Sequence, residues 1–131
     1  MRIVLDTNVL VSALWSENNR LAKILSLVID GSLLLCYDAN IMREYEDVLS
    51  RPHLAFRFAD ARVCEIISKI RADGLCVAVK PSTVSMVDED DRYFYDVAKA
   101  CHAILITGNT KHYPAEPLIM TPARFLEMFA L

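Results

Sequence analysis

Three acidic residues stand at positions where an isolated carboxylate would be costly to bury. Asp6 directly follows the apolar run at residues 3–5, which is typical of a strand buried on both faces. Glu44 lies in a helical pattern at the edge of its apolar stripe, and Asp91 shares the inward face of another helix with Phe94. Crowded carboxylates repel one another and raise each other's pKa unless a divalent cation keeps them ionised. The three acids together therefore indicate a site for a hard cation.

Oxygen donors without a cluster of His or Cys favour Mg²⁺ or Mn²⁺ over zinc. Such a cation typically acts on phosphates, because it activates water and neutralises charge on the reacting group. Each acid also has a simpler interpretation, since Asp6 is a good helix N-cap and Asp91 can cap its helix or stabilise its first turn. Asp88, Glu89 and Asp90 are interpreted as solvated charges that favour a helix N-terminus. For Asp6 and Asp91, the cap and the ligand interpretations both stay open.

Strand-like and helix-like segments alternate along the chain, which predicts how the acids are positioned. Short apolar runs predict strands at residues 3–5, 33–37, 75–79, 103–107 and 118–120. Helical spacing predicts helices at residues 9–14, 21–29, 61–71, 88–101 and 122–129, and another that Asp38 caps and that ends near Pro52. Residues 15–19 are predicted to form a loop, and residues 51–59 are ambiguous. The pattern predicts a single α/β domain over residues 1–131, with a mostly parallel five-stranded sheet flanked by helices.

Composition narrows the class of protein. The chain has 131 residues, of which 54% are hydrophobic and 24% charged, as expected for one folded domain. The net charge of -3 shows no global basic field for nucleic acid, although it does not exclude such a ligand. Four scattered cysteines without a Cys-x-x-Cys pair argue against a zinc site or a disulfide framework. Asp6 and Asn8 interrupt the first apolar stretch too early for a signal peptide, and no membrane-spanning run occurs, so we expect a cytoplasmic protein.

Four segments of the sequence resemble the PIN-domain family, and most closely its branch of toxin components of toxin–antitoxin systems. The segments are VLDTNVLVSA at residues 4–13, REYEDVL at 43–49, DEDDRYFYDVA at 88–98 and ITGNTKHYP at 106–114. They occur in the order of the family and extend over nearly the whole chain. Each segment alone is a weak signal, but the four together are fairly specific.

The resemblance implies a Mg²⁺- or Mn²⁺-dependent endoribonuclease that cleaves single-stranded RNA, with an antitoxin partner and a homodimeric assembly. The implied catalytic metal ligands are Asp6, Glu44 and Asp91, with Asn8, Thr107 and Asn109 as supporting polar groups. The chain departs from the family pattern at Asn109, where the family has an aspartate. An amide oxygen can bind a hard cation but adds no charge, which favours a single cation.

Two further functions compete with this interpretation. A PIN-like scaffold that binds RNA or protein through a weakened metal site is the main alternative. A nucleotide-binding α/β module is less consistent, because the chain has only three glycines and no glycine-rich phosphate loop. Lys111 and His112 follow the last motif and could contact RNA phosphates, although solvated loop residues are the simpler interpretation. Trp15 and Tyr113 could stack on bases, but we expect them to be partly buried in the core.

Overall fold

The strands form one parallel sheet with the order β3-β2-β1-β4-β5. The computed structural model describes residues 1–15, 20–51 and 60–129. Its strands are β1 (Arg2–Leu5), β2 (Leu34–Tyr37), β3 (Leu75–Cys76), β4 (Ile104–Ile106) and β5 (Ile119–Met120). Ile3, Val4 and Leu5 of the central strand β1 are fully buried. This agrees with the continuous apolar run expected of a parallel strand that is covered on both faces.

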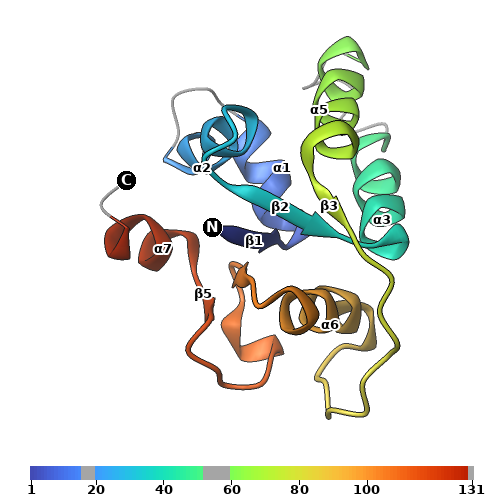
Figure 1. Ribbon diagram of the computed structural model, residues 1–131, viewed down its shortest axis with the longest axis vertical. Helices are drawn as coiled ribbons and strands as arrows, with labels where there is room; N and C mark the ends of the chain where they lie inside the picture. Colours follow the sequence, from blue (N-terminus) through green and yellow to red (C-terminus); the bar gives the residue numbers. More distant parts are fainter. Residues whose placement is uncertain (16–19, 52–59, 130–131) are drawn as a thin grey trace.

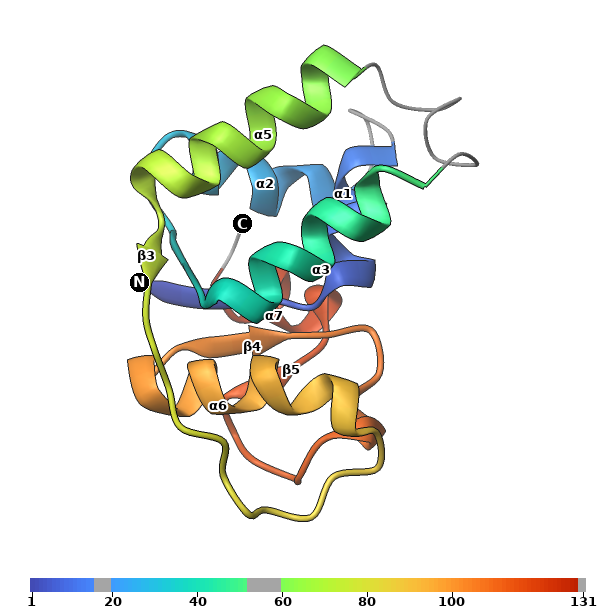
Figure 2. The same ribbon diagram turned by 90° about the vertical axis from the view of Figure 1, so that its right-hand side faces the viewer.

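Helices cover both sides of this sheet. In the described residues they are α1 (Thr7–Trp15), α2 (Leu21–Ile29), α3 (Ala39–Leu49), α5 (Asp60–Asp73), α6 (Arg92–Cys101) and α7 (Pro122–Met128). Two short 3₁₀ turns, η1 (Glu89–Asp91) and η2 (Thr110–His112), precede and follow the α6–β4 unit. Figures 1 and 2 both show α6 on the side of the molecule opposite α1, α2 and α5. None of the described helices is long and apolar enough to cross a membrane.

The order of the strands creates a switch point beside β1. The chain moves outward from β1 to β2 and β3, and then returns to place β4 on the other side of β1. In open parallel sheets, ligands bind in the crevice beyond the carboxyl ends of the strands at such a switch point. Leu5 and Ile106 pair at the last register position of β1 and β4. The residues that follow them, Asp6 and Thr107, therefore meet at this crevice.

Local interactions fix the elements around the crevice. The Asp38 carboxylate caps α3 by accepting a hydrogen bond from the backbone N–H of Ile41 (2.8 Å). The buried Tyr45 hydroxyl of α3 donates to the carbonyl of Leu5, which ties this helix to the end of β1. These two contacts hold α3, and with it the segment that carries Glu44, beside the carboxyl end of the central strand.

The α/β class and the five-stranded parallel sheet that the sequence predicts are confirmed. The third strand is shorter than predicted, because β3 covers Leu75–Cys76 rather than residues 75–79. The N–H of Val77 still donates to the carbonyl of Tyr37 (2.9 Å), but Tyr37 ends β2, so the following residues have no strand to pair with. The predicted helix at 88–101 is divided into η1 and α6. The helix that was predicted to end near Pro52 is α3, which ends earlier, at Leu49, with Ser50 as its C-cap. Residues 16–19 of the predicted loop and the ambiguous residues 52–59 lie outside the described residues.

Candidate active site

Asp6 is held in place by Thr107, the residue that directly follows the neighbouring strand β4. The hydroxyl of Thr107, which is fully buried, donates to Oδ2 of Asp6 (2.7 Å) and accepts a hydrogen bond from the N–H of Asn109 (3.1 Å). The N–H of Asp6 donates to the carbonyl of Ile106 (3.0 Å), which continues the β1–β4 pairing beyond the strands. The carboxylate is thus oriented across the sheet, as expected of a ligand with a supporting hydrogen bond.

Glu44 reaches the same place from α3. The hydroxyl of Thr7, the residue after Asp6, donates to Oε2 of Glu44. The pKa of Glu44 is raised mainly by burial, and the charge of Asp6 raises it further, while the hydrogen bond from Thr7 lowers it. Two carboxylates from β1 and α3 therefore repel each other across the first turn of α1.

Asp91 enters from the N-terminus of α6. Its side chain is 17% exposed, and Oδ2 lies 3.3 Å from Nδ1 of His112. Burial, followed by the charges of Asp6 and Asp88, raises the pKa of Asp91 to about 6, although His112 lowers it. Asp91 occupies the N-cap position of α6 but makes no capping hydrogen bond through its side chain. This geometry removes the main support for the cap interpretation of Asp91.

The three acids influence one another electrostatically without forming a closed ligand cage. Asp6 raises the pKa of both Glu44 and Asp91. Within the described residues, no group of three or more His, Cys, Asp or Glu side chains is close enough to hold a metal ion. Mg²⁺ usually keeps several waters and is bound through one or two carboxylates together with phosphate oxygens. An open set of carboxylates with hydroxyl supports fits such a hydrated cation better than a fully protein-coordinated one.

The structure gives only some of the other predicted residues a contact at the site. Asn8 and Asn109 are exposed, and Asn109 contributes its backbone N–H to Thr107. Lys111 is exposed, while His112 lies against Asp91. The supporting role of Asn8 therefore has no contact in the described structure that favours it. These assignments, like those of the acids, stay predictions.

Sequence reasoning missed Thr7 and, for Tyr113, favoured partial burial in the core over stacking on bases. Thr7 is 4% exposed and bonds Glu44, which no pattern in the sequence indicates beyond its position after Asp6. Tyr113 is 6% exposed, and its hydroxyl has no hydrogen-bond partner among the described residues. After burial, the charges of Asp6, Asp91 and Glu44 are the largest causes that raise its pKa. The hydroxyl is thus near enough to the three acids for their charges to act on it.

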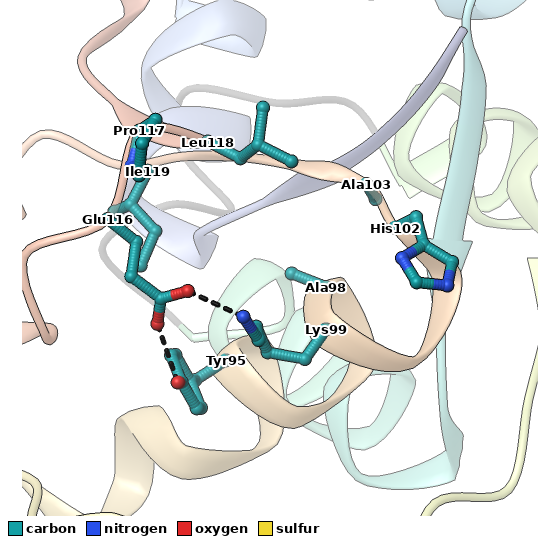
Figure 3. Close-up of a pocket in the computed structure, with 9 residues that line it drawn as sticks. All are labelled: Tyr95, Ala98, Lys99, His102, Ala103, Glu116, Pro117, Leu118 and Ile119. Carbon is teal, nitrogen blue, oxygen red and sulfur yellow. Dashed lines mark hydrogen bonds and ion pairs between the residues drawn. The ribbon is translucent and has the colours of Figure 1, made fainter.

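A separate cavity of about 370 Å³ lies beside the C-terminal half of α6. It is lined by Tyr95, Ala98, Lys99, His102, Ala103, Glu116, Pro117, Leu118 and Ile119. Figure 3 shows the carboxylate of Glu116 between the hydroxyl of Tyr95 and Nζ of Lys99, each 2.6 Å away. The charged groups of Glu116 and Lys99 are thus already paired with each other inside this cavity.

Comparison with known proteins agrees with the order of the motifs. A model of the PIN domain matches residues 2–111, a range that includes all three acids and the sheet from β1 to β4. A protein of Methanocaldococcus jannaschii, described as uncharacterized, is 31% identical over 112 residues, which cover 83% of this chain and 71% of the relative. With a parallel sheet whose switch point carries Asp6, and with a match over most of its length, the chain belongs to the PIN domain family, whose members are generally nucleases.

Proposed function

We propose that this protein is a Mg²⁺- or Mn²⁺-dependent endoribonuclease that cleaves single-stranded RNA. The observation that carries the proposal is the position of Asp6, which is fixed by Thr107 and raises the pKa of both Glu44 and Asp91. Three carboxylates from separate elements that repel one another are stabilised when a divalent cation binds between them.

The residues of the chain have distinct roles in this proposal. A bound divalent cation supplies activation of water and neutralisation of the phosphodiester charge. Asp6, Glu44 and Asp91 hold the cation, while Thr107 and Thr7 orient the first two carboxylates through hydrogen bonds. Lys111 is exposed and His112 half-exposed beside this site, so both can contact the phosphates of an RNA strand.

The biological role in this proposal is that of the toxin of a toxin–antitoxin pair, acting in the cytoplasm. Support comes from the resemblance of the four sequence segments to the toxin branch, which also implies an antitoxin partner and a homodimer. The alternative is a PIN-like scaffold whose metal site is too weak for cleavage, because Asn109 adds no charge. Binding of Mn²⁺ and cleavage of RNA by the same protein distinguish the two roles.

Asp6→Asn and Asp38→Asn form a matched pair for the decisive experiment. Both aspartates follow a parallel strand, but Asp38 accepts from the N–H of Ile41 in the helix that it caps, whereas Asp6 accepts from Thr107 at the end of another strand. Asparagine caps helices nearly as well as aspartate does, so we expect Asp38→Asn to keep cleavage. We expect Asp6→Asn to lose cleavage by a factor of about 10² or more, because one charge is removed from the cation's ligands.

The measurement is the rate at which a labelled single-stranded RNA is cut in Mn²⁺ or Mg²⁺, alongside calorimetric titration of each protein with Mn²⁺. Cleavage retained by Asp6→Asn would remove Asp6 from the ligands. If the wild-type protein binds no Mn²⁺ at millimolar concentration, even with RNA present, the nuclease proposal fails and the scaffold role takes its place.

A further inference from the structure

Tyr113 carries a buried polar group that lacks a partner. Its side chain is 6% exposed, and its hydroxyl makes no hydrogen bond with any of the described residues. Most buried polar side-chain atoms in proteins do have a partner, because an unpaired buried hydroxyl forfeits its bonds to water. The hydroxyl of Tyr113 therefore requires an explanation that the packing of the protein alone does not provide.

Other buried tyrosines in this chain show how the requirement is usually met. Tyr95 has the same exposure of 6%, and its hydroxyl donates to Glu116 (2.6 Å). Tyr45 is fully buried, and its hydroxyl donates to the carbonyl of Leu5. Tyr113 differs from both because its hydroxyl has no partner among the described residues. Its backbone is nevertheless held in place, since it directly follows η2 and its N–H donates to the carbonyl of Thr110 (3.2 Å).

The surroundings of the hydroxyl indicate what it faces. After burial, the charges of Asp6, Asp91 and Glu44 contribute most to the raised pKa of Tyr113. The phenol therefore keeps its proton and is available as a hydrogen-bond donor. Its chain neighbour His112 lies 3.3 Å from Asp91, and the hydroxyl itself bonds none of the described residues. We infer that the missing acceptor arrives with whatever binds between the carboxylates.

We propose that Tyr113 is a positioning residue whose hydroxyl donates a hydrogen bond to an oxygen atom that enters the acidic site together with the cation. That oxygen belongs either to a water of the hydrated cation or to a phosphate of the RNA, since both are acceptors of similar size. This role rests on the proposed function, because it requires that a cation bind at Asp6, Glu44 and Asp91. It adds a neutral donor whose hydroxyl is not already bonded to one of the acids, as those of Thr7 and Thr107 are, and so orients the incoming oxygen without opposing the cation.

Tyr113→Phe removes only the hydroxyl, and Tyr95→Phe is the matched control, since it removes a paired hydroxyl from an equally buried ring outside the site. The full chain of each variant is titrated calorimetrically with Mn²⁺, alone and with a 2′-O-methyl single-stranded oligonucleotide that supplies intact phosphodiesters. The Tm of each variant is also measured in a chelator. We expect Tyr113→Phe to bind Mn²⁺ about tenfold more weakly than the wild type, the size of effect typical of groups that support metal ligands.

The Tm without cation separates this role from a structural one. We expect the Tm of Tyr113→Phe to equal or exceed that of the wild type, because the variant no longer buries an unpaired hydroxyl. Tyr95→Phe is expected to lower the Tm and to leave Mn²⁺ affinity unchanged. A weaker affinity for Mn²⁺ alone identifies the acceptor as a hydration water, and a loss that appears only with the oligonucleotide identifies a phosphate oxygen.

The failure of this inference is distinguishable from the failure of the proposed function. If the wild type binds Mn²⁺ and Tyr113→Phe binds it equally well in both conditions, the role of Tyr113 is wrong while the metal site stands. A Tm of Tyr113→Phe well below that of the wild type in chelator means that the hydroxyl already has a partner within the protein, which also overturns the inference. If the wild type itself binds no Mn²⁺, the proposed function fails and this role fails with it.

Discussion

Asp6 and Asp38 illustrate how the same residue type at the same kind of position acquires different roles. Each directly follows a parallel strand and directly precedes a helix. The carboxylate of Asp38 is satisfied by a backbone N–H three residues away, so it serves its own helix. The carboxylate of Asp6 accepts from Thr107, which is 101 residues away in the sequence and directly follows another strand, β4. A local interaction fixes the first side chain, whereas only the folded sheet fixes the second.

The pKa of Asp91 leads to a prediction for the protein without divalent cations. Burial and the charges of Asp6 and Asp88 raise this pKa from 3.8 to about 6. Between these values the folded protein binds more protons than the unfolded chain. The contribution of Asp91 to stability is therefore fully present below the lower value and is lost as the pH rises through the higher one. We expect the free energy of unfolding of Asp91→Asn to fall less than that of the wild type as the pH rises from about 3.5 to 7. Urea denaturation in a chelator measures the difference.

The free energies of unfolding of the wild type and of Asp91→Asn are expected to converge at the acidic end of this pH range, where both proteins carry an uncharged group at position 91. Toward neutral pH the variant is expected to have the larger free energy of unfolding, since Asp6 no longer faces a charge there. Parallel profiles across the whole range would show that Asp91 titrates at its ordinary value in the folded protein.

The sequence singled out the acids, and the family resemblance singled out Thr107 beside Asp6, but neither indicated a role for Thr7 or Tyr113 at the site. Asp6 and Asp91 stand out because acids on apolar faces or after buried strands are unusual. Thr7 and Tyr113 do not stand out, since a threonine in a helix and a tyrosine in a core are ordinary. Their importance depends on what lies opposite them in the folded chain, namely Glu44 for Thr7 and the group of acids for Tyr113. Pairings between distant elements cannot be derived from spacing alone.

At the scale of elements, the alternation of strands and helices could be predicted from the sequence, whereas the ends of the edge strands could be predicted less well. The buried runs of β1 and β4 are covered on both faces, and hydrophobicity alone identifies them. The edge strand β3 depends on the length of its neighbour, because its pairing stops where β2 ends at Tyr37. The following residues are attached to α6 instead, through the N–H of Ser82 to Asp96 (2.9 Å) and through Arg92 to the carbonyl of Ser82 (2.9 Å). Figure 2 shows this segment running around the outer side of α6.

Gly74, in the turn between α5 and β3, supports a prediction about the packing of these elements. A Cβ atom at this position would lie 2.5 Å from the carbonyl oxygen of Ile70 and 2.9 Å from that of Leu35. Backbone atoms cannot move aside as a flexible side chain can, so Gly74→Ala would displace α5 from β2. We expect it to lower the free energy of unfolding by about 2 kcal/mol, within the range for overpacked sites. Urea denaturation measures the difference.

Gly108→Ala is the control for this prediction, because an added Cβ there meets no atom within 4 Å. We expect the free energy of unfolding of this variant to be close to that of the wild type under the conditions used for Gly74→Ala. A loss of stability that is equal in both variants would mean that the close approach at Gly74 does not limit the packing of α5.

At the scale of the whole molecule, the acidic site joins parts of the chain that are distant in sequence. Asp6 follows β1, Glu44 belongs to α3 and Asp91 precedes α6, so their repulsion acts between separate elements of the fold. If these acids bind a cation as proposed, function and stability are opposed, since the same charges destabilise the protein while the cation is absent. Binding of the cation reverses this effect, because a ligand that binds only the folded state stabilises that state.

We therefore expect Asp6→Asn to be more stable than the wild type without a cation and less stable than the wild type when a cation is added. In a chelator, Asp6→Asn is expected to be more stable by on the order of 1 kcal/mol, the free energy of about one pKa unit, because the charge that raises the pKa of Glu44 and Asp91 is gone. In Mn²⁺ at a hundredfold excess over its Kd, the wild type is expected to gain about 2.7 kcal/mol, while the variant gains much less. Thermal unfolding of both proteins over a series of Mn²⁺ concentrations measures the concentration at which their stabilities are equal.

The Asp38→Asn variant is the control and is expected to follow the wild type throughout, since the side chain at this position caps α3. An Asp6→Asn protein that is less stable than the wild type in chelator would show that Asp6 supports the fold rather than the binding of a cation.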